Sequence, residues 1–261
     1  MEKAIKEVVK EKYTEVVSSS QSCCGPDCCS PGGIDFSEGY EGLEGYTAEA
    51  DLGLGCGLPT EFARIQKGHT VLDLGSGAGN DVFIARSLAG ETGRVIGLDM
   101  TEAMIAQAEA NNKKLGYRNI EFVLGDIEDM PLEDNSVDVA ISNCVMNLVP
   151  DKKKAFSEVF RVLRPGGHFS ISDIVLRGEL PPAIQEAAVM YAGCVAGAMQ
   201  KGDYLNVIEE TGFTNIRIDK ERQLNLPDQL LLDFLSPDEL EAFRNSGTGI
   251  FSINIYGEKR S

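Results

Sequence analysis

The sequence predicts an α/β fold built on a doubly wound, mostly parallel β-sheet. From about residue 69, short apolar runs alternate with helix-like stretches. Strands and helices that alternate at this rhythm favour parallel pairing with right-handed crossovers. The first apolar run ends in a glycine-rich turn at residues 73–79. Apolar residues make up 43% of the 261-residue chain, which is enough to fill the core of one such domain.

An amphipathic helix is expected over residues 4–17, because apolar side chains recur there at the i, i+3, i+4 spacing. Val8 belongs to this apolar stripe, through which we expect the helix to dock on the domain. Residues 18–33 are polar, contain Gly and Pro and hold four of the seven cysteines, so they predict a loop. Residues 34–60 are rich in glycine and predict irregular structure, with a short helix near Thr60.

Five strands and three helices are expected in the middle of the chain. The strands are residues 70–74, 94–98, 120–124, 137–142 and 168–174. The helices are residues 81–88, 101–115 and 151–162. Thr101 is the expected N-cap of the second helix. The Arg-Pro-Gly-Gly segment 164–167 is expected to end the third helix.

The last third of the chain is predicted to add helices and two more strands. Pro181 and Pro182 open a helical stretch that reaches about Met199, because proline suits the first turn of a helix. This stretch leaves the sheet at its carboxyl edge and is expected to fold over that edge as a lid. The remaining expected elements are a helix at 203–211, a strand at 215–219, helical structure at 225–245 and a strand at 250–256.

Charge and composition argue against several classes of function. The formal net charge is −17, and a field of that sign repels nucleic acids and anionic membrane surfaces. The sequence has neither the run of about 18 apolar residues that predicts a membrane span nor an apolar signal segment near its start. The expected compartment is the cytoplasm, where thiols stay reduced. The seven cysteines are therefore expected to be ligands, redox groups or core residues rather than a disulfide framework.

The glycine-rich turn predicts a cofactor site. Such a turn between a strand and a helix lets a ligand approach the backbone and presents the helix N-terminus to it. The dinucleotide fingerprint G-x-G-x-x-G needs a third glycine where Asn80 stands, so NAD and FAD are disfavoured. Asp99 ends the second strand about 20 residues further on, where a carboxylate can accept both hydroxyls of a ribose. Asp126 follows the third strand, where a polar group can meet the edge of a purine.

Four motifs resemble those of the class I S-adenosylmethionine-dependent methyltransferases. They are Asp-Leu-Gly-Ser-Gly-Ala-Gly at 73–79, Asp99-Met100, Gly125-Asp126-Ile127 and Leu-Arg-Pro-Gly-Gly at 163–167. The resemblance spans about residues 65–175. It implies a Rossmann-like sheet of seven strands with the last one antiparallel, and the number of expected strands agrees. It also implies S-adenosylmethionine as the cofactor.

The same resemblance assigns roles to individual residues. The backbone near Gly75–Gly77 is expected to face the methionyl part of the cofactor, and Asp99 is expected to hold the ribose. Met100, Asp126 and Ile127 are expected to frame the adenine. The full set of expected cofactor-binding residues is Asp73, Gly75, Ser76, Gly77, Asp99, Met100, Asp126, Ile127 and Asn143.

Three cysteines outside the N-terminal cluster come from segments that can meet above the transferable methyl group. Cys56 lies between glycines before the first strand, Cys144 follows the fourth strand, and Cys194 lies in the expected lid. The alternative is that each is a small buried core residue. Three thiolates suit a soft centre, whereas zinc prefers four ligands, and His69 and His168 show no metal-ligand spacing. Trivalent arsenic takes three sulfurs and keeps a lone pair, which is the nucleophile that a methyl sulfonium needs.

The segments around these three cysteines resemble the arsenite methyltransferases. The resembling segments are 54–59, 142–148 and 194–198. Together with the cofactor motifs they cover most of the chain between about residues 40 and 205. The resemblance implies that Cys56, Cys144 and Cys194 bind As(III) and are the catalytic residues.

The N-terminal cysteine cluster also resembles bacterial members of that family. Its members are Cys23, Cys24, Cys28 and Cys29. One of them is expected either to pair with Cys56 during turnover or to pass arsenic inward. The alternative is a peripheral cluster that binds As(III) or another thiophilic metal without a catalytic role.

The implied activity is methyl transfer from S-adenosylmethionine to arsenite or methylarsenite, in arsenic detoxification. The substrate is expected to arrive as arsenite or a thiol conjugate, with thioredoxin or glutathione as the reductant, and the protein is expected to be a monomer. Two rival hypotheses stay open. One is a methyltransferase for another small molecule, such as a quinone precursor, and the other is a non-catalytic thiol protein that binds metalloids.

We expect three parts along the chain. Residues 1–40 form the N-terminal helix and the cysteine-rich loop, and residues 41–176 form the cofactor-binding core. Residues 177–261 form the lid helices and the C-terminal strands, and 181–212 belong to the arsenic-binding part.

Overall fold

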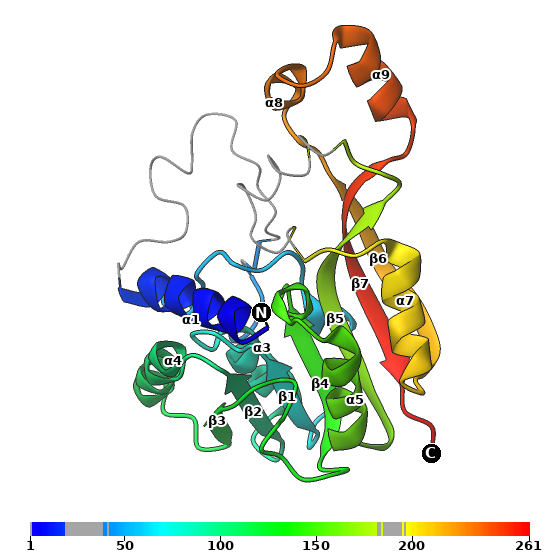
Figure 1. Ribbon diagram of the computed structural model, residues 1–261. Helices are drawn as coiled ribbons and strands as arrows, with labels where there is room; N and C mark the ends of the chain where they lie inside the picture. The colour runs from blue at the N-terminus through cyan, green and yellow to red at the C-terminus, as the bar shows by residue number, and fades with distance from the viewer. Residues whose placement is uncertain (1, 19–38, 41, 182–183, 185–194, 196) are drawn as a thin grey trace.

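The computed structural model describes residues 2–18, 39–40, 42–181, 184, 195 and 197–261. Its centre is a seven-stranded sheet in the order β3-β2-β1-β4-β5-β7-β6, with helices packed against it (Figure 1). β7 runs antiparallel to β5 and β6, and the other neighbouring strands are parallel. The predicted doubly wound α/β sheet with one antiparallel strand is therefore confirmed.

The middle of the chain follows the predicted elements closely. The strands are β1 Thr70–Leu74, β2 Arg94–Asp99, β3 Ile120–Leu124, β4 Val137–Asn143, β5 Leu163–Arg177, β6 Thr214–Leu224 and β7 Gly249–Glu258. The helices are α1 Glu2–Ser18, α2 Pro59–Phe62, α3 Asn80–Ala89, α4 Glu102–Leu115, α5 Lys152–Val162, α7 Lys201–Glu210, α8 Asp228–Leu232 and α9 Pro237–Asn245, with a 3-10 turn, η1, at Met146–Leu148. Most boundaries fall within about two residues of the prediction, which is the usual scatter at element ends.

The C-terminal strands and the segment between them differ from the prediction. β5 is longer at both ends than the expected 168–174. Its start extends because Leu163 pairs with Val137 of β4, and its end extends because the pairing with β7 continues to Arg177. β6 continues to Leu224 because it also pairs with β7. The helical segment expected at 225–245 is two short helices, because the Ser236 side chain caps α9 as a separate helix.

The N-terminal helix is present as predicted, and α1 lies beside α4 (Figure 1). Of the expected apolar stripe, Val9 and Tyr13 face the domain as predicted, whereas the prediction was wrong at Val8, which is 63% exposed. The helix expected between Pro181 and about Met199 falls mainly on residues outside the described part of the chain. No helix among the described residues is long and apolar enough to cross a lipid bilayer.

Apolar side chains fill both faces of the sheet. On one face, α5 and α7 pack through Phe156 and Tyr204, which are fully buried and meet edge to face. On the other face, α3 packs through Val82 and Phe83. Full burial of one such apolar side chain contributes about 1.5–3 kcal/mol. The two layers hold the strand ends that form the candidate site in fixed positions.

Candidate active site

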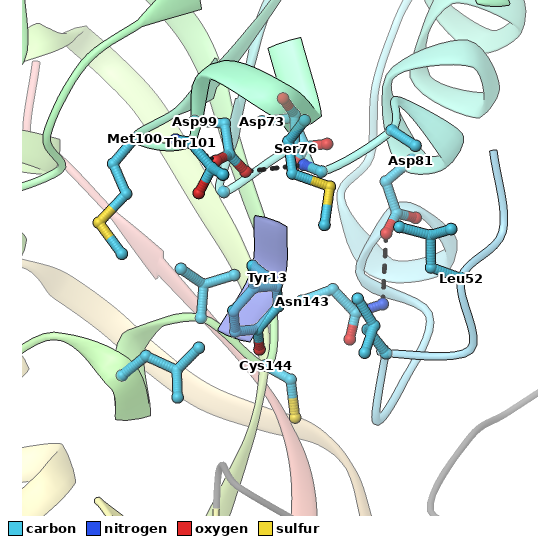
Figure 2. Close-up of a pocket in the computed structure, with 18 of the residues that line it drawn as sticks. Tyr13, Leu52, Asp73, Ser76, Asp81, Asp99, Met100, Thr101, Asn143 and Cys144 are labelled. Atoms are coloured by element: carbon cyan, nitrogen blue, oxygen red, sulfur yellow. Dashed lines mark hydrogen bonds between the residues drawn. The ribbon is translucent and has the colours of Figure 1, made fainter. Parts of the chain in front are cut away.

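The strand order reverses between β1 and β4, and a cavity opens at the carboxyl ends of these strands. Such a switch point is where open α/β sheets bind ligands. The cavity contains about 1080 Å³ of empty space, part of it continuous with solvent (Figure 2). All the residues that were expected to bind the cofactor line it: Asp73, Gly75, Ser76, Gly77, Asp99, Met100, Asp126, Ile127 and Asn143. The fold therefore brings residues from the ends of four strands to one place.

Two glycines of the turn after β1 adopt positive φ angles, which favour glycine. Gly75 has a φ of +70°, and a Cβ there would lie 2.5 Å from the Val145 side chain. Gly77 has a φ of +52°, and a Cβ there would meet no atom closer than 4.0 Å. The N–H groups of Gly75 and Ser76 donate to Leu98 O at 2.7 and 3.0 Å. The backbone of the turn is thus fixed, and it is open to close approach at Gly77.

Two backbone donors hold Asp99 at the end of β2. Gly77 N–H donates to Oδ2 at 3.0 Å, and Thr101 N–H donates to Oδ1 at 2.8 Å. Burial raises the pKa of Asp99, and these hydrogen bonds oppose the shift. Thr101 is the N-cap residue of α4 as predicted, but its side chain makes no capping hydrogen bond. The Asp99 carboxylate lines the cavity, where it is placed to accept hydroxyl groups of a ligand.

Two more carboxyls, Asp73 and Asp81, are buried in the same wall of the cavity. Burial raises the pKa of Asp81 to about 6, although Tyr40 O–H and Asn143 N–H both donate to it. Burial, with the charges of Asp81 and Asp99, raises the pKa of Asp73 well above its usual value. A cationic ligand would offset the repulsion among these carboxyls.

Three buried polar atoms on the cavity wall have no hydrogen-bond partner among the described residues. They are Ser76 Oγ, Asn80 Nδ2 and Asp81 Oδ1. Leaving a buried polar group unpaired costs about 1–3 kcal/mol, and most such groups in proteins are paired. A ligand that carries both donors and acceptors would satisfy all three atoms.

Asn143 joins the cavity wall to the segment that carries Cys56. Its Oδ1 accepts from Cys56 N–H at 3.0 Å and from Gly57 N–H at 3.3 Å. Its Nδ2 donates to Gly57 O at 2.8 Å, Tyr40 Oη at 2.5 Å and Asp81 Oδ2 at 3.2 Å. The Asn143 amide is therefore engaged within the protein, where it fixes the Cys56 backbone against the end of β4.

Cys56 and Cys144 meet at the edge of the cavity although 88 residues separate them. They form a disulfide with 5.8 Å between their Cα atoms, and both are buried. The expectation of free thiols therefore differs from the structure, which holds the oxidised pair. Cys194 lies outside the described residues, and so do the four cysteines of the N-terminal cluster.

Asp173, on β5, is a polar neighbour of this cysteine pair that the sequence did not point to. One of its carboxyl oxygens and the Sγ atoms of Cys56 and Cys144 all lie within 4.8 Å of one another. Burial raises the pKa of Asp173 to about 7, although hydrogen bonds from Ile174 N–H and Tyr204 O–H oppose the shift. The pair is thus next to a carboxyl that shares its buried environment.

Apolar side chains also pack around the cysteine pair. Leu224 and Leu226 at the end of β6, with Leu231 of α8, belong to the same buried cluster as Cys56 and Cys144. The segment between β6 and β7 therefore forms one wall of the buried cluster that contains the pair.

Both histidines bond to the backbone. Gln66 N–H donates to His69 Nδ1 at 3.2 Å, and His168 Nε2 lies 2.7 Å from Ala63 O. Burial lowers the pKa of His168. Within the described ranges, neither belongs to a group of side chains that could hold a metal ion.

Three residues of α1, which the sequence also did not indicate, complete the cavity. Lys6, Val9 and Tyr13 line it, and Figure 2 shows Tyr13 in the same cavity as Asp99 and Asn143. Lys6 Nζ donates to Asp126 Oδ2 and to Glu128 Oε2, each at 2.6 Å. The helix therefore covers the part of the cavity where Asp126 lies.

Known proteins with similar sequences include several methyltransferases. A family model described as a methyltransferase domain matches residues 65–212. An arsenite methyltransferase of Halobacterium salinarum is 41% identical over 269 residues, which cover 97% of this chain and 66% of that protein. One of Aquipseudomonas alcaligenes is 36% identical over 188 residues, which cover 69% of this chain and 54% of that protein. The chain thus spans between about half and two thirds of the length of these curated relatives.

Solved structures agree with this grouping. The X-ray crystal structure of CrArsM, an arsenic (III) S-adenosylmethionine methyltransferase from Chlamydomonas reinhardtii, matches with a TM-score of 0.63 and 33% identity. The match covers 79% of this chain and 67% of that chain. The YcgJ protein of Bacillus matches with a TM-score of 0.63 at 22% identity, which shows a shared fold.

Proposed function

The chain belongs to the class I S-adenosylmethionine-dependent methyltransferases, and we propose that it methylates trivalent arsenic. The observation that carries the proposal is the meeting of Cys56 and Cys144 beside the cofactor cavity. Two sulfurs from distant parts of the chain next to a methyl donor suit a soft acceptor better than a carbon or oxygen acceptor. The two relatives at 41% and 36% identity, both arsenite methyltransferases, support the same acceptor.

The cavity fits S-adenosylmethionine. When bound, this cofactor supplies a methyl group on a cationic sulfur. Asp73 and Asp81 place carboxyls in the wall where they stabilise a cation. Asp99 is oriented to accept the ribose hydroxyls, and Asp126 with Ile127 borders the end of the cavity that we assign to adenine. The unpaired donor and acceptor atoms on the wall match the amino and carboxylate groups of the methionyl part.

The cysteines become arsenic ligands after reduction. Two electrons and two protons from a thiol reductant, either thioredoxin or glutathione, convert the Cys56–Cys144 disulfide into two thiols. Each thiol then replaces one hydroxyl of As(OH)₃ and releases one water molecule. Cys194 is the proposed third ligand. The arsenic lone pair carries no proton, so the site needs no general base to activate the acceptor.

Single Cys56→Ser, Cys144→Ser and Cys194→Ser variants test this function. Each variant is incubated with arsenite, S-adenosylmethionine and a thiol reductant, and the arsenic products are identified by mass spectrometry. We expect each variant to lose about tenfold or more in methylation rate, because an alcohol does not replace a thiolate on a soft centre. Calorimetric binding of S-adenosylmethionine is the control for a folded cofactor site.

Full methylation by all three variants would contradict the ligand assignment. Arsenite binding by the wild type without any methylated product would identify a thiol protein that only binds metalloids. Turnover of a quinone precursor and not of arsenite would identify a methyltransferase for another small molecule. If arsenite is the acceptor, methylation of arsenite and methylarsenite serves arsenic detoxification.

A further inference from the structure

α1 contributes to the cofactor cavity from outside the part of the chain that the methyltransferase family model matches. The model covers residues 65–212, whereas α1 covers Glu2–Ser18. Lys6, Val9 and Tyr13 line the cavity, and their spacing of three and four residues puts them on one face of the helix. α1 therefore has a defined face toward the cofactor.

Lys6 makes two ion pairs at the end of the cavity that we assign to adenine. Its Nζ lies 2.6 Å from Asp126 Oδ2 and 2.6 Å from Glu128 Oε2. The side chains of Lys6 and Glu128 are only 22% and 9% exposed, so water competes less for these two charges than at an open surface, whereas the Asp126 side chain is 39% exposed. Glu128 Oε1 also accepts from Asp151 N–H at 2.9 Å, which anchors the network to the start of α5.

These contacts fix the orientation of Asp126. Its Oδ1 accepts from Glu128 N–H at 2.9 Å while its Oδ2 accepts from Lys6. Burial raises the pKa of Asp126, but the hydrogen bonds from Lys6 and from Glu128 N–H outweigh burial and lower it. Each carboxylate oxygen has a further lone pair for a ligand. An oriented carboxylate at the edge of a purine accepts from an amino group and rejects a carbonyl, because two acceptors cannot pair.

We propose that Lys6 is a positioning residue for the cofactor, which acts by holding the Asp126 carboxylate toward the amino group of the adenine. Val9 and Tyr13, on the same face of α1, cover the adenosyl group. The inference depends on the cofactor of the family and not on arsenic as the acceptor. Its test therefore contains no arsenic, and its outcome is independent of the outcome for the cysteine variants.

Lys6→Met is the test variant, because it keeps the apolar stem and removes the ammonium group. Lys10→Met is the matched control, since Lys10 is exposed on the same helix. Calorimetry measures the Kd of the full chain for S-adenosylhomocysteine and for its 6-oxo analogue, in which inosine replaces adenosine. We expect Lys6→Met to raise the Kd for S-adenosylhomocysteine about tenfold and that for the 6-oxo analogue less than about twofold. Lys10→Met should change neither Kd.

An equal loss of affinity for both ligands would show that Lys6 only attaches α1 to the domain, and it would overturn the proposal. An unchanged Kd for S-adenosylhomocysteine would also overturn it. Lys6→Arg keeps the positive charge, and we expect it to retain the preference for the amino purine. If circular dichroism shows that Lys6→Met does not fold, Lys6→Gln is compared with Lys6→Arg by the same two Kd values and the same criteria.

Discussion

Asp173 keeps its proton in the folded protein at pH values where an exposed aspartate has lost it. Burial raises its pKa to about 7 from the ordinary 3.8, although the nearby charge of Lys152 and hydrogen bonds from Ile174 N–H and Tyr204 O–H oppose the shift. The folded state therefore binds this proton more tightly than the unfolded state does. The contribution of Asp173 to the free energy of unfolding falls as the pH rises from about 4 to about 7, by at most about 4 kcal/mol.

Asp173→Asn removes this titration while keeping an oxygen that accepts from Tyr204 O–H. We expect the fall in the free energy of unfolding between pH 4.5 and 7.5 to be about 2–4 kcal/mol smaller in the variant than in the wild type. Urea unfolding at the two pH values measures it. Asp233→Asn, at an exposed position, is the control. Equal pH dependence in all three proteins would contradict the prediction. The variant should keep some pH dependence, because Asp81 also has a raised pKa of about 6.

Individual residues of the candidate site were predictable where they directly follow a strand that the local sequence predicts. Asp99 and Asp126 follow predicted strands, and parallel strands end at one edge of a sheet. Lys6 was not predictable as a site residue, because its partner Asp126 is 120 residues away. Asp173 was not predictable either, since its partner Tyr204 lies 31 residues away and its burial comes from tertiary packing.

At the scale of elements, β6 shows why the C-terminal part was harder to predict. Its second half, residues 220–223, reads Lys-Glu-Arg-Gln and lacks the apolar alternation that marks a strand. Pairing with β7 nevertheless keeps this half extended. The extension carries Leu224 and α8 to the cysteine pair, so the wall of that pair depends on strand pairing that no local pattern shows.

Leu231 and Leu232 are neighbours on α8 that test this wall. Leu231 is fully buried in the cluster around the cysteines, and Leu232 is 46% exposed. We expect Leu231→Ala to lower the free energy of unfolding by about 2–4 kcal/mol, because it leaves a cavity in that cluster. Leu232→Ala, the matched control, should change it by less than about 0.5 kcal/mol. Both are measured by urea unfolding without reductant, and equal effects would show that α8 does not pack there.

At the scale of the whole molecule, the disulfide links the segment before β1 to the end of β4. The loop that it closes spans 88 residues, so its removal frees the unfolded chain considerably. We expect dithiothreitol to lower the free energy of unfolding of the wild type by about 2–4 kcal/mol. The Cys56→Ser/Cys144→Ser double variant should not respond to dithiothreitol. If dithiothreitol lowers the free energy of unfolding of the double variant as much as that of the wild type, the effect comes from other cysteines.

The overall fold was predictable because its signals are local, whereas the state of the cysteines was not. The βα rhythm and the turn at 73–79 each lie within a short window of sequence. The expectation of reduced thiols came from the inferred compartment. A compartment does not indicate which cysteines lie close together in the folded chain. Only the folded chain shows that Cys56 and Cys144 are close enough to bond.

Asn143 and Cys144 are consecutive residues, and they give the two parts of the site a common backbone. Asn143 bonds to Asp81 and Tyr40 on the cofactor side, and Cys144 carries one of the two sulfurs. If the bound methyl donor changes the affinity of the cysteine pair for the acceptor by some factor, the bound acceptor changes the affinity of the cavity for the methyl donor by the same factor. The reason is that one coupling free energy describes both effects. The order in which donor and acceptor enter thus affects the rate of assembly, while the fully loaded enzyme has the same free energy by either route.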